Sequence, residues 1–238
     1  YDWTGRATFR ASRLLSRCAD LIIANSHAGL TYHSNHGYPS ERITVVHNGI
    51  DTCRFVMDRE VRKKVRQELG LDPRGRAIGM VGRLDPMKDH PTLILAAAEV
   101  IKEHPDVSFI CVGNGPRSYR QHLLQLCEQH GASRNFIWAG ARKDIELIYN
   151  AFDVAVLSSA AGEGFPNVLG EAMACGIPCV ATDVGDVRLL LGNMGQVVPP
   201  KNPGALAAAI CAMMESKPAA ASVRQRIIDE FSVNALVR

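Results

Sequence analysis

The protein has 238 residues, of which 47% are hydrophobic, 21% charged and 6% aromatic. This is the composition of a soluble globular protein with a sizeable core, and it excludes disordered, collagen-like and coiled-coil classes. The net charge of +3 is too small to indicate nucleic-acid binding. No segment approaches the roughly 18 consecutive apolar residues that a membrane span requires.

Cysteine usage indicates a reducing compartment. The chain has seven cysteines, an odd number without a Cys-x-x-Cys pair, and most of them lie in apolar runs. We therefore predict buried, reduced thiols of a cytosolic protein, and no zinc site at the closely spaced Cys175 and Cys179. The seven are Cys18, Cys53, Cys111, Cys127, Cys175, Cys179 and Cys211.

Short apolar stretches alternate with amphipathic ones along the chain, which predicts alternating strands and helices. Ser26 is a plausible N-cap and Gly70 a plausible helix end. The first residue is Tyr1 rather than Met, and the sequence ends at Arg238 within a helical pattern, so we expect a fragment of a longer protein. The expected strands are 21–24, 43–46, 77–81, 107–112, 135–138, 154–157, 178–182 and 195–198, and the expected helices are 26–36, 58–69, 90–103, 118–130, 144–151, 167–174 and 203–214.

Most of these strands are apolar along their whole length, which is typical of a parallel sheet covered by helices on both faces. We therefore predict a doubly wound, Rossmann-like α/β domain over residues 52–216. Ligands of such sheets bind at the carboxyl ends of the strands. The loops that follow Val81, Val112, Trp138 and Leu157 should therefore lie along one rim.

Two cations, Arg83 and Lys88, leave the end of the first strand of this domain just after Gly82. A planar guanidinium and a mobile ammonium together suit a diphosphate, although two solvated surface cations have the same pattern. The next loop, 113–116, has glycines that either approach a ligand or turn tightly. It is not a Gly-x-Gly-x-x-Gly fingerprint, because Ser118 occupies the last position, so a nicotinamide cofactor is disfavoured.

The loop 158–167 carries the most information. Glycines flank Glu163, and Pro166 with Asn167 favours the start of a helix whose free amides attract an anion. Glu171 lies about one turn inside that helix, where a carboxylate can accept hydrogen bonds from vicinal hydroxyls. Either glutamate alone could be an ordinary solvated acid, but two acids around an anion-binding helix start indicate a site.

The sequence gives no support for a metal or a nucleophilic triad. It contains no Asp-x-Asp and no Gly-x-Ser-x-Gly, and its histidines, cysteines and aspartates do not cluster. The histidines of the first part are expected to be surface or capping residues. They are His27, His33, His36 and His47.

Glu163 and Glu171 have seven residues between them. With the neighbouring Gly-Phe-Pro-Asn and Glu-Ala-Met-Ala segments, they resemble the double-glutamate motif of the family 4 retaining glycosyltransferases, which have the GT-B fold of two Rossmann-like domains. Collinear segments across roughly 18–215 resemble the same family. These are His-Asn-Gly-Ile-Asp at 47–51, Val-Gly-Arg-Leu with a later Lys at 81–88, Val-Gly-Asn-Gly-Pro at 112–116 and Val-Pro-Pro at 198–200.

The resemblance implies that the chain is the C-terminal half of a GT-B enzyme. Residues 1–51 would be the remnant of the acceptor domain with the linker, 52–216 the nucleotide-sugar domain, and 217–238 truncated closing helices. Arg83, Lys88 and Glu163 would be catalytic, the two cations holding the donor diphosphate and Glu163 the hydroxyls of the transferred sugar. Glu171 would hold the ribose. The remaining donor-binding residues would be Gly82, Arg142 beside the base, Gly164, Phe165 and Pro166 along the sugar, and the backbone of Asn167 and Val168 at a phosphate.

The implied activity is transfer of a sugar from a nucleoside-diphosphate sugar to a saccharide or lipid-linked acceptor, with retention, in polysaccharide or glycolipid synthesis. No metal and no cofactor beyond this co-substrate are expected. The implied location is cytoplasmic or peripheral at the inner face of the plasma membrane, through the missing N-terminal domain. The fragment alone is expected to be inactive. The alternatives are another GT-B enzyme, such as a sugar-nucleotide epimerase, and a non-catalytic nucleotide-sugar-binding module.

Three positions depart from the family pattern beside the site. Asp89 stands where a glycine often follows the lysine, Gly185-Asp186 replaces a frequent Gly-Gly, and Leu189 stands where a glutamate is common. We expect these departures to affect the subgroup and the substrate rather than the family.

Overall fold

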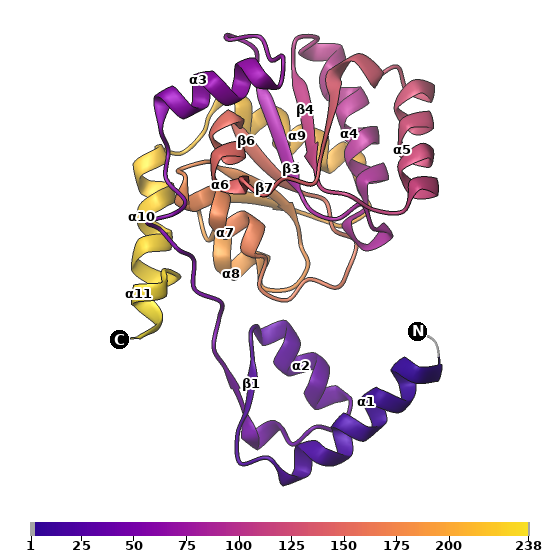
Figure 1. Ribbon diagram of the computed structural model, residues 1–238, viewed down its shortest axis with the longest axis vertical. Coiled ribbons are helices and arrows are strands. Elements are labelled where there is room, and N and C mark those ends of the chain that lie inside the picture. Colours follow the sequence, from indigo (N-terminus) through magenta and orange to yellow (C-terminus); the bar gives the residue numbers. More distant parts are fainter. Residues whose placement is uncertain (1–2, 238) are drawn as a thin grey trace.

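The computed structural model describes residues 3–237, which form a small N-terminal part and a larger α/β part (Figure 1). In the small part, β1 (Ile22–Ala24) and β2 (Ile43–Val45) pair in parallel, with α1 (Trp3–Leu15) and α2 (His27–Asn35) beside them. The predicted cap is confirmed, because the Ser26 hydroxyl accepts a hydrogen bond from the Gly29 N–H at 3.0 Å. The linker from β2 then leads into the larger part.

The larger part contains one six-stranded sheet in the order β5-β4-β3-β6-β7-β8, with every neighbouring pair parallel. The chain winds outward from β3 in one direction and then returns to continue from β6 in the other. The strand order therefore reverses between β3 and β6, where such folds bind ligands. The strands are β3 (Ala77–Val81), β4 (Ser108–Val112), β5 (Phe136–Gly140), β6 (Val154–Leu157), β7 (Cys179–Thr182) and β8 (Gly195–Val198).

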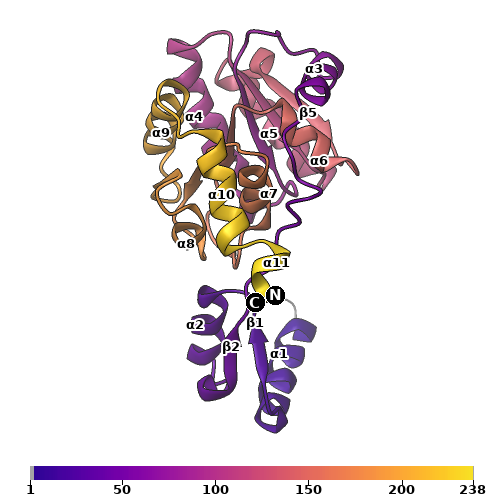
Figure 2. The same cartoon turned by 90° about the vertical axis from the view of Figure 1, so that its left-hand side faces the viewer.

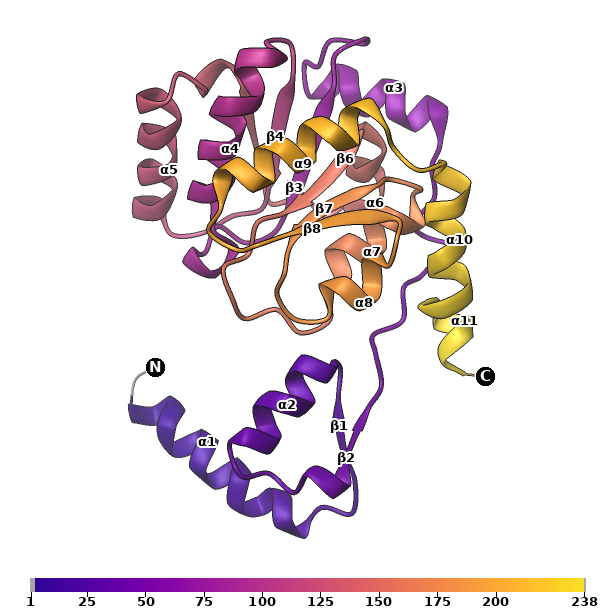
Figure 3. The same cartoon turned by 180° about the vertical axis from the view of Figure 1, so that it is seen from behind.

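Helices cover both faces of this sheet (Figures 2 and 3). Alternate strand residues point to opposite faces, so Ile78 and Met80 pack with one helix layer while Ala77 packs with the other. The first layer is α4 (His90–Glu103), α5 (Arg117–Gln129) and α9 (Pro203–Glu215); the second is α3 (Arg59–Glu68), α6 (Ile145–Ile148), α7 (Asn167–Ala174), α8 (Val187–Leu191) and α10 (Ala220–Glu230). Short 3-10 turns lie at Ser16–Cys18, Ser40–Arg42, Pro86–Lys88, Ser133–Asn135 and Tyr149–Ala151.

The predicted doubly wound α/β fold is confirmed, and most element boundaries agree within two residues. Helices α1 and α8 were not among the expected ranges. The expectation of buried thiols holds for Cys111, Cys127, Cys175 and Cys179, but it is wrong for Cys18 and Cys53, which are exposed. Among the helices of residues 3–237, none combines the length and the apolar character that crossing a membrane requires.

The C-terminal helices hold the linker, which is the segment around Ile50 that follows β2, against the larger part. The Ile50 N–H donates to the Phe231 carbonyl at 2.8 Å, and the Val233 N–H donates back to the Ile50 carbonyl at 3.1 Å. These bonds join the linker to the segment between α10 and α11 (Val233–Leu236). Because α10 also packs on α7, the linker is held close to the helix that carries Glu171.

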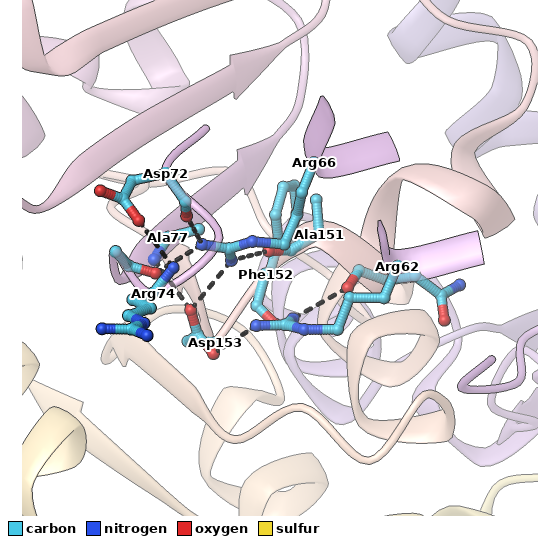
Figure 4. Close-up of polar contacts among 10 residues, drawn as sticks. Arg62, Arg66, Asp72, Arg74, Ala77, Ala151, Phe152 and Asp153 are labelled. Carbon is cyan, nitrogen blue, oxygen red and sulfur yellow. Dashed lines mark hydrogen bonds and ion pairs between the residues drawn. The ribbon is translucent and has the colours of Figure 1, made fainter. Parts of the chain in front are cut away.

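A buried arginine links α3 to the segments before β3 and β6 (Figure 4). Arg66 is 5% exposed and donates to the carbonyls of Ala151, Asp72 and Gly75. Its guanidinium also forms an ion pair with the Asp153 carboxylate at 3.3 Å. The same carboxylate forms a second ion pair, with Arg62, and accepts a hydrogen bond from the Ala77 N–H. The network ties α3 to the start of β3 and to the segment before β6.

Candidate functional site

The loops after β3 and β6 meet at the reversal of the strand order. The Ala160 N–H donates to the Met87 carbonyl at 2.9 Å, and the Ser158 hydroxyl donates to the Lys88 carbonyl at the same distance. Ser158 is fully buried, so it holds the first loop from below. The two loops that the sequence singled out are therefore one structural unit.

Lys88 and Glu163 form the centre of this unit. The Lys88 Nζ lies 2.5 Å from Glu163 Oε1, and both side chains are largely shielded from solvent. The buried Ser159 hydroxyl also donates to Glu163 Oε1 at 2.5 Å. A carboxylate fixed by two donors keeps its second oxygen for a ligand hydroxyl, while the ammonium can exchange toward a phosphate.

Arg83 is exposed and makes no hydrogen bond or ion pair with the rest of residues 3–237, so its guanidinium is free for a ligand. Its loop is fixed by the glycines of 113–116. A Cβ at Gly113, where φ is +145°, would lie 1.9 Å from the Gly82 carbonyl oxygen, and one at Gly115 would lie 2.1 Å from the Leu84 oxygen. Because these two glycines have no side chain, the backbone of residues 82–84 can pack directly against them.

The start of α7 faces the same rim. Phe165 and Pro166 are buried, whereas Asn167 is exposed and accepts a hydrogen bond from the Asn48 side chain at 3.0 Å. The Asn167 N–H donates to the Phe165 carbonyl at 3.0 Å, whereas no group of the described chain accepts from the Val168 N–H. Of the two amides that the resemblance places at a phosphate, only that of Val168 is free at this helix start, a place that favours an anion.

Glu171 follows one turn later and rests on a buried tyrosine. The Tyr149 hydroxyl lies 2.8 Å from Glu171 Oε2. Burial raises the pKa of the Glu171 carboxyl, while the hydrogen bond from Tyr149 and the nearby charge of Arg54 lower it. The carboxylate thus lies partly buried at the rim with one oxygen engaged.

Arg142 is held by carboxylates rather than standing free. Its guanidinium donates to both Asp144 oxygens, at 2.9 and 2.7 Å, and to Glu68 at 2.6 Å. The hydrogen bonds to Asp144 and then to Glu68 raise its pKa. These partners occupy the edge of the guanidinium, so only its flat faces remain for the base beside which Arg142 was predicted to lie.

The backbone conformation of Asp89 explains how an aspartate can stand where the family often has a glycine. Its φ is +48°, the left-handed conformation that glycine adopts most easily and aspartate tolerates. The Asp89 carboxylate also caps α4, accepting from the Thr92 N–H at 3.3 Å and from the Thr92 hydroxyl at 2.7 Å. The aspartate therefore fits the same backbone and adds a helix cap.

The expectation that histidines, cysteines and aspartates do not cluster is wrong at two places among the described residues. Glu103, His104 and Cys211 form one group. The side chains of His27, His47 and Asp186 have ligand atoms within 4.8 Å of one another. Both Asp186 oxygens accept from backbone N–H groups at the start of α2, from His27 at 2.7 Å and Ala28 at 3.0 Å, and one also meets His47 Nε2 at 3.1 Å. This is a helix cap supplied from the far end of the chain, and residues 159 apart are invisible to a local pattern.

Asp186 also contacts the loop 158–167, because its N–H donates to the Gly164 carbonyl at 3.0 Å. We expect Asp186→Ala to raise the hydrogen-exchange rate of the His27 and Ala28 amides and to cost about 1–2 kcal/mol, because these two N–H groups lose their acceptor while the Ser26 cap remains. Exchange measured by mass spectrometry tests this. Asp183→Ala, in the same loop but exposed and paired with Arg188, is the control. Equal protection in wild type and Asp186→Ala would contradict the capping role.

The sequence did not single out Ser159, Tyr149 or Asp186 as functional. Ser159 follows the end of a buried strand, a position where polar residues reach the rim, so its signal was present. Tyr149 lies in an apolar stretch and is indistinguishable there from a core residue.

The site thus combines two cations, two glutamates and a free helix start at the reversal point of a Rossmann-like sheet. A model for the glycosyl transferases group 1 matches residues 75–216, and one for Glycosyltransferase Family 4 matches residues 2–54. The chain belongs to this family of GT-B glycosyltransferases.

A D-inositol 3-phosphate glycosyltransferase from Corynebacterium urealyticum is 36% identical over 204 residues, covering 81% of this chain and 48% of the relative. The chain thus spans about half the length of the curated relatives it matches. Anabaena HepE, solved in complex with UDP and glucose, superposes with a TM-score of 0.89 at 30% identity, covering 97% of this chain and 64% of that one. A sucrose-phosphate synthase from Thermosynechococcus elongatus has the same fold, with a TM-score of 0.85 at 23% identity, covering 97% and 59%.

Proposed function

We propose that the chain is the donor-binding half of a retaining glycosyltransferase that takes a nucleoside-diphosphate sugar and transfers the sugar to a saccharide or lipid-linked acceptor. The observation that carries the proposal is the pairing of Lys88 with Glu163 at the reversal of the strand order. It brings a phosphate-binding cation and a hydroxyl-binding carboxylate together, as the junction between diphosphate and sugar requires. The UDP and UDP-glucose complexes of HepE support the donor class.

In this proposal Arg83 and Lys88 bind the diphosphate, with the free Val168 N–H at one phosphate. Breaking the bond from the anomeric carbon leaves negative charge on the nucleotide and positive charge on the sugar. The two cations and the helix start stabilise the first charge. The Glu163 carboxylate holds the sugar hydroxyls as the ring becomes cationic.

The other proposed residues contact the ribose, the base and the rest of the donor. Glu171 binds the ribose hydroxyls, Arg142 lies beside the base, and Gly82, Gly164, Phe165 and Pro166 line the donor. We also propose residues 52–216 as the donor domain, 1–51 as the end of the acceptor domain with the linker, and 217–238 as closing helices. The acceptor would bind chiefly to the part of the relatives that this chain does not cover.

Nucleoside diphosphates are expected to bind about tenfold more tightly than the corresponding monophosphates, because Arg83 and Lys88 together need two phosphate groups. Lys88→Met should remove most of this preference. Titration calorimetry with UDP, ADP and GDP against UMP, AMP and GMP measures it. Lys63→Met, which removes an exposed cation far from the rim, is the matched control.

The same titrations with EDTA should give unchanged affinities, since the proposed site holds the diphosphate with protein cations alone.

A panel of nucleotide sugars then identifies the donor by thermal shift. A ligand at 100 times its Kd stabilises the fold by about 2.7 kcal/mol. Equal binding of mono- and diphosphates would contradict the diphosphate assignment.

A further inference from the structure

The Glu171 carboxylate rests on Tyr149, a residue with no assigned role. Tyr149 is 1% exposed and lies in the 3-10 turn that follows α6. Its ring is packed edge-on by Phe55, at 5.9 Å between centroids, and by Phe152, at 5.8 Å. The ring therefore has little freedom, and its hydroxyl has a fixed position.

That hydroxyl has one hydrogen and two acceptors within reach. Glu171 Oε2 lies at 2.8 Å and the Val168 carbonyl oxygen at 3.0 Å. The carboxylate is closer and charged, so it is the stronger acceptor. Oε1 has no protein donor among residues 3–237, which leaves this oxygen for a ligand at the rim.

The two oxygens of Glu171 thus have separate tasks. A carboxylate free to rotate offers its lone pairs in many directions, whereas one anchored through Oε2 presents Oε1 in a single direction. The two lone pairs of Oε1 can then accept hydrogen bonds from two vicinal hydroxyls of one sugar. A sugar that lacks one of these hydroxyls leaves one lone pair without a donor. The anchor matters because discrimination against a missing hydroxyl depends on a fixed polar partner.

We infer that Tyr149 is a positioning residue that fixes Glu171 and so makes the site select ribonucleotides over 2′-deoxyribonucleotides. The inference rests on the proposed function and adds a sugar specificity to its nucleotide site. Tyr149 acts only through Glu171, because its hydroxyl lies beneath the carboxylate.

Protonation gives a second consequence. A protonated Glu171 loses part of its acceptor capacity, so the ribose preference should fall as the pH drops through its pKa. The groups that act on this carboxyl are Tyr149 and Arg54, which favour the ionised form, and Glu146, which opposes it along with burial. Removing the Tyr149 hydroxyl takes away a donor to the ionised form, so the fall should begin at a higher pH.

The test compares affinities for UDP and 2′-deoxy-UDP by titration calorimetry, with the ADP and GDP pairs used in the same way. Wild type is expected to prefer the ribose form about tenfold or more. Tyr149→Phe should reduce that ratio about threefold to tenfold, with little change in affinity for the deoxy form, and shift its pH dependence upward. In a Glu171→Gln background, Tyr149→Phe should change the ratio no further.

Tyr119→Phe is the matched control, because the Tyr119 hydroxyl is buried without a hydrogen-bond partner in the described chain. It should leave the ratio unchanged. If Tyr149→Phe fails to fold, Phe55→Leu loosens the same ring while keeping the hydroxyl, and it should lower the ratio too. Equal losses for both sugars, or an unchanged ratio, would overturn the inference alone. No binding of any diphosphate to wild type would overturn the proposed function as well.

Discussion

Glu163→Gln is expected to weaken nucleotide-sugar binding about tenfold to a hundredfold, while the bare nucleoside diphosphate binds as well as before or better. A charge-assisted hydrogen bond to a carboxylate contributes about 1.5–3 kcal/mol, and in the proposed site only the transferred sugar contacts Glu163. The bare diphosphate gains because Lys88, which pairs with Glu163 at 2.5 Å in the free protein, is released for the phosphates. Titration calorimetry with both ligands separates the two effects.

Glu171→Gln is the comparison for this experiment, because the ribose is present in both ligands. It should weaken the two by similar factors. Where the proposed donor domain acts together with an acceptor domain, Glu163→Gln should also lower kcat, since the proposed transfer requires that the sugar be held as it becomes cationic. If Glu163→Gln damages binding of the bare diphosphate as much as Glu171→Gln does, the two roles have been assigned wrongly.

Asp153→Ala is expected to cause the largest loss of stability, about 3–5 kcal/mol, because it leaves the buried Arg66 guanidinium without its counter-charge. Burial lowers the pKa of Arg66, and the charge and hydrogen bond of Asp153 act against this shift. The substitution also removes the acceptor of the Ala77 N–H at the start of β3 (Figure 4). For a chain of this size the melting temperature should fall by on the order of 10 °C.

Thermal unfolding followed by circular dichroism measures this effect. Glu60→Ala is the control, because it breaks the ion pair with Lys63, in which both side chains are mostly exposed. Such pairs contribute about 0–1 kcal/mol, so its melting temperature should barely change. Similar melting temperatures for the two variants would show that the buried network does not anchor α3.

The strands and helices of the large part could be predicted because their signals are local. β6 and α4, for example, have the predicted bounds, since an apolar run or a helical period ends where polar and turn residues begin. The parallel arrangement followed from strands that are apolar on both faces. Helix α8 has only five residues, which is too short for a helical period to stand out.

The site could be predicted only in part. The strand ends place Lys88 and Glu163 on one rim, but their direct ion pair depends on how two loops pack. Tyr149 and Asp186 act across the chain, through contacts with Glu171 and with the start of α2. Contacts of this kind leave no periodicity in the sequence, and an apolar neighbourhood conceals the tyrosine.

A crystal structure of the protein with UDP would show whether this rim binds the donor nucleotide. We expect the two phosphates between Arg83, Lys88 and the start of α7, with the ribose hydroxyls within hydrogen-bond distance of Glu171. A nucleotide bound elsewhere would overturn the proposed donor site. One such place is the cavity at the opposite ends of the strands, lined by Met57, Arg62 and Lys217.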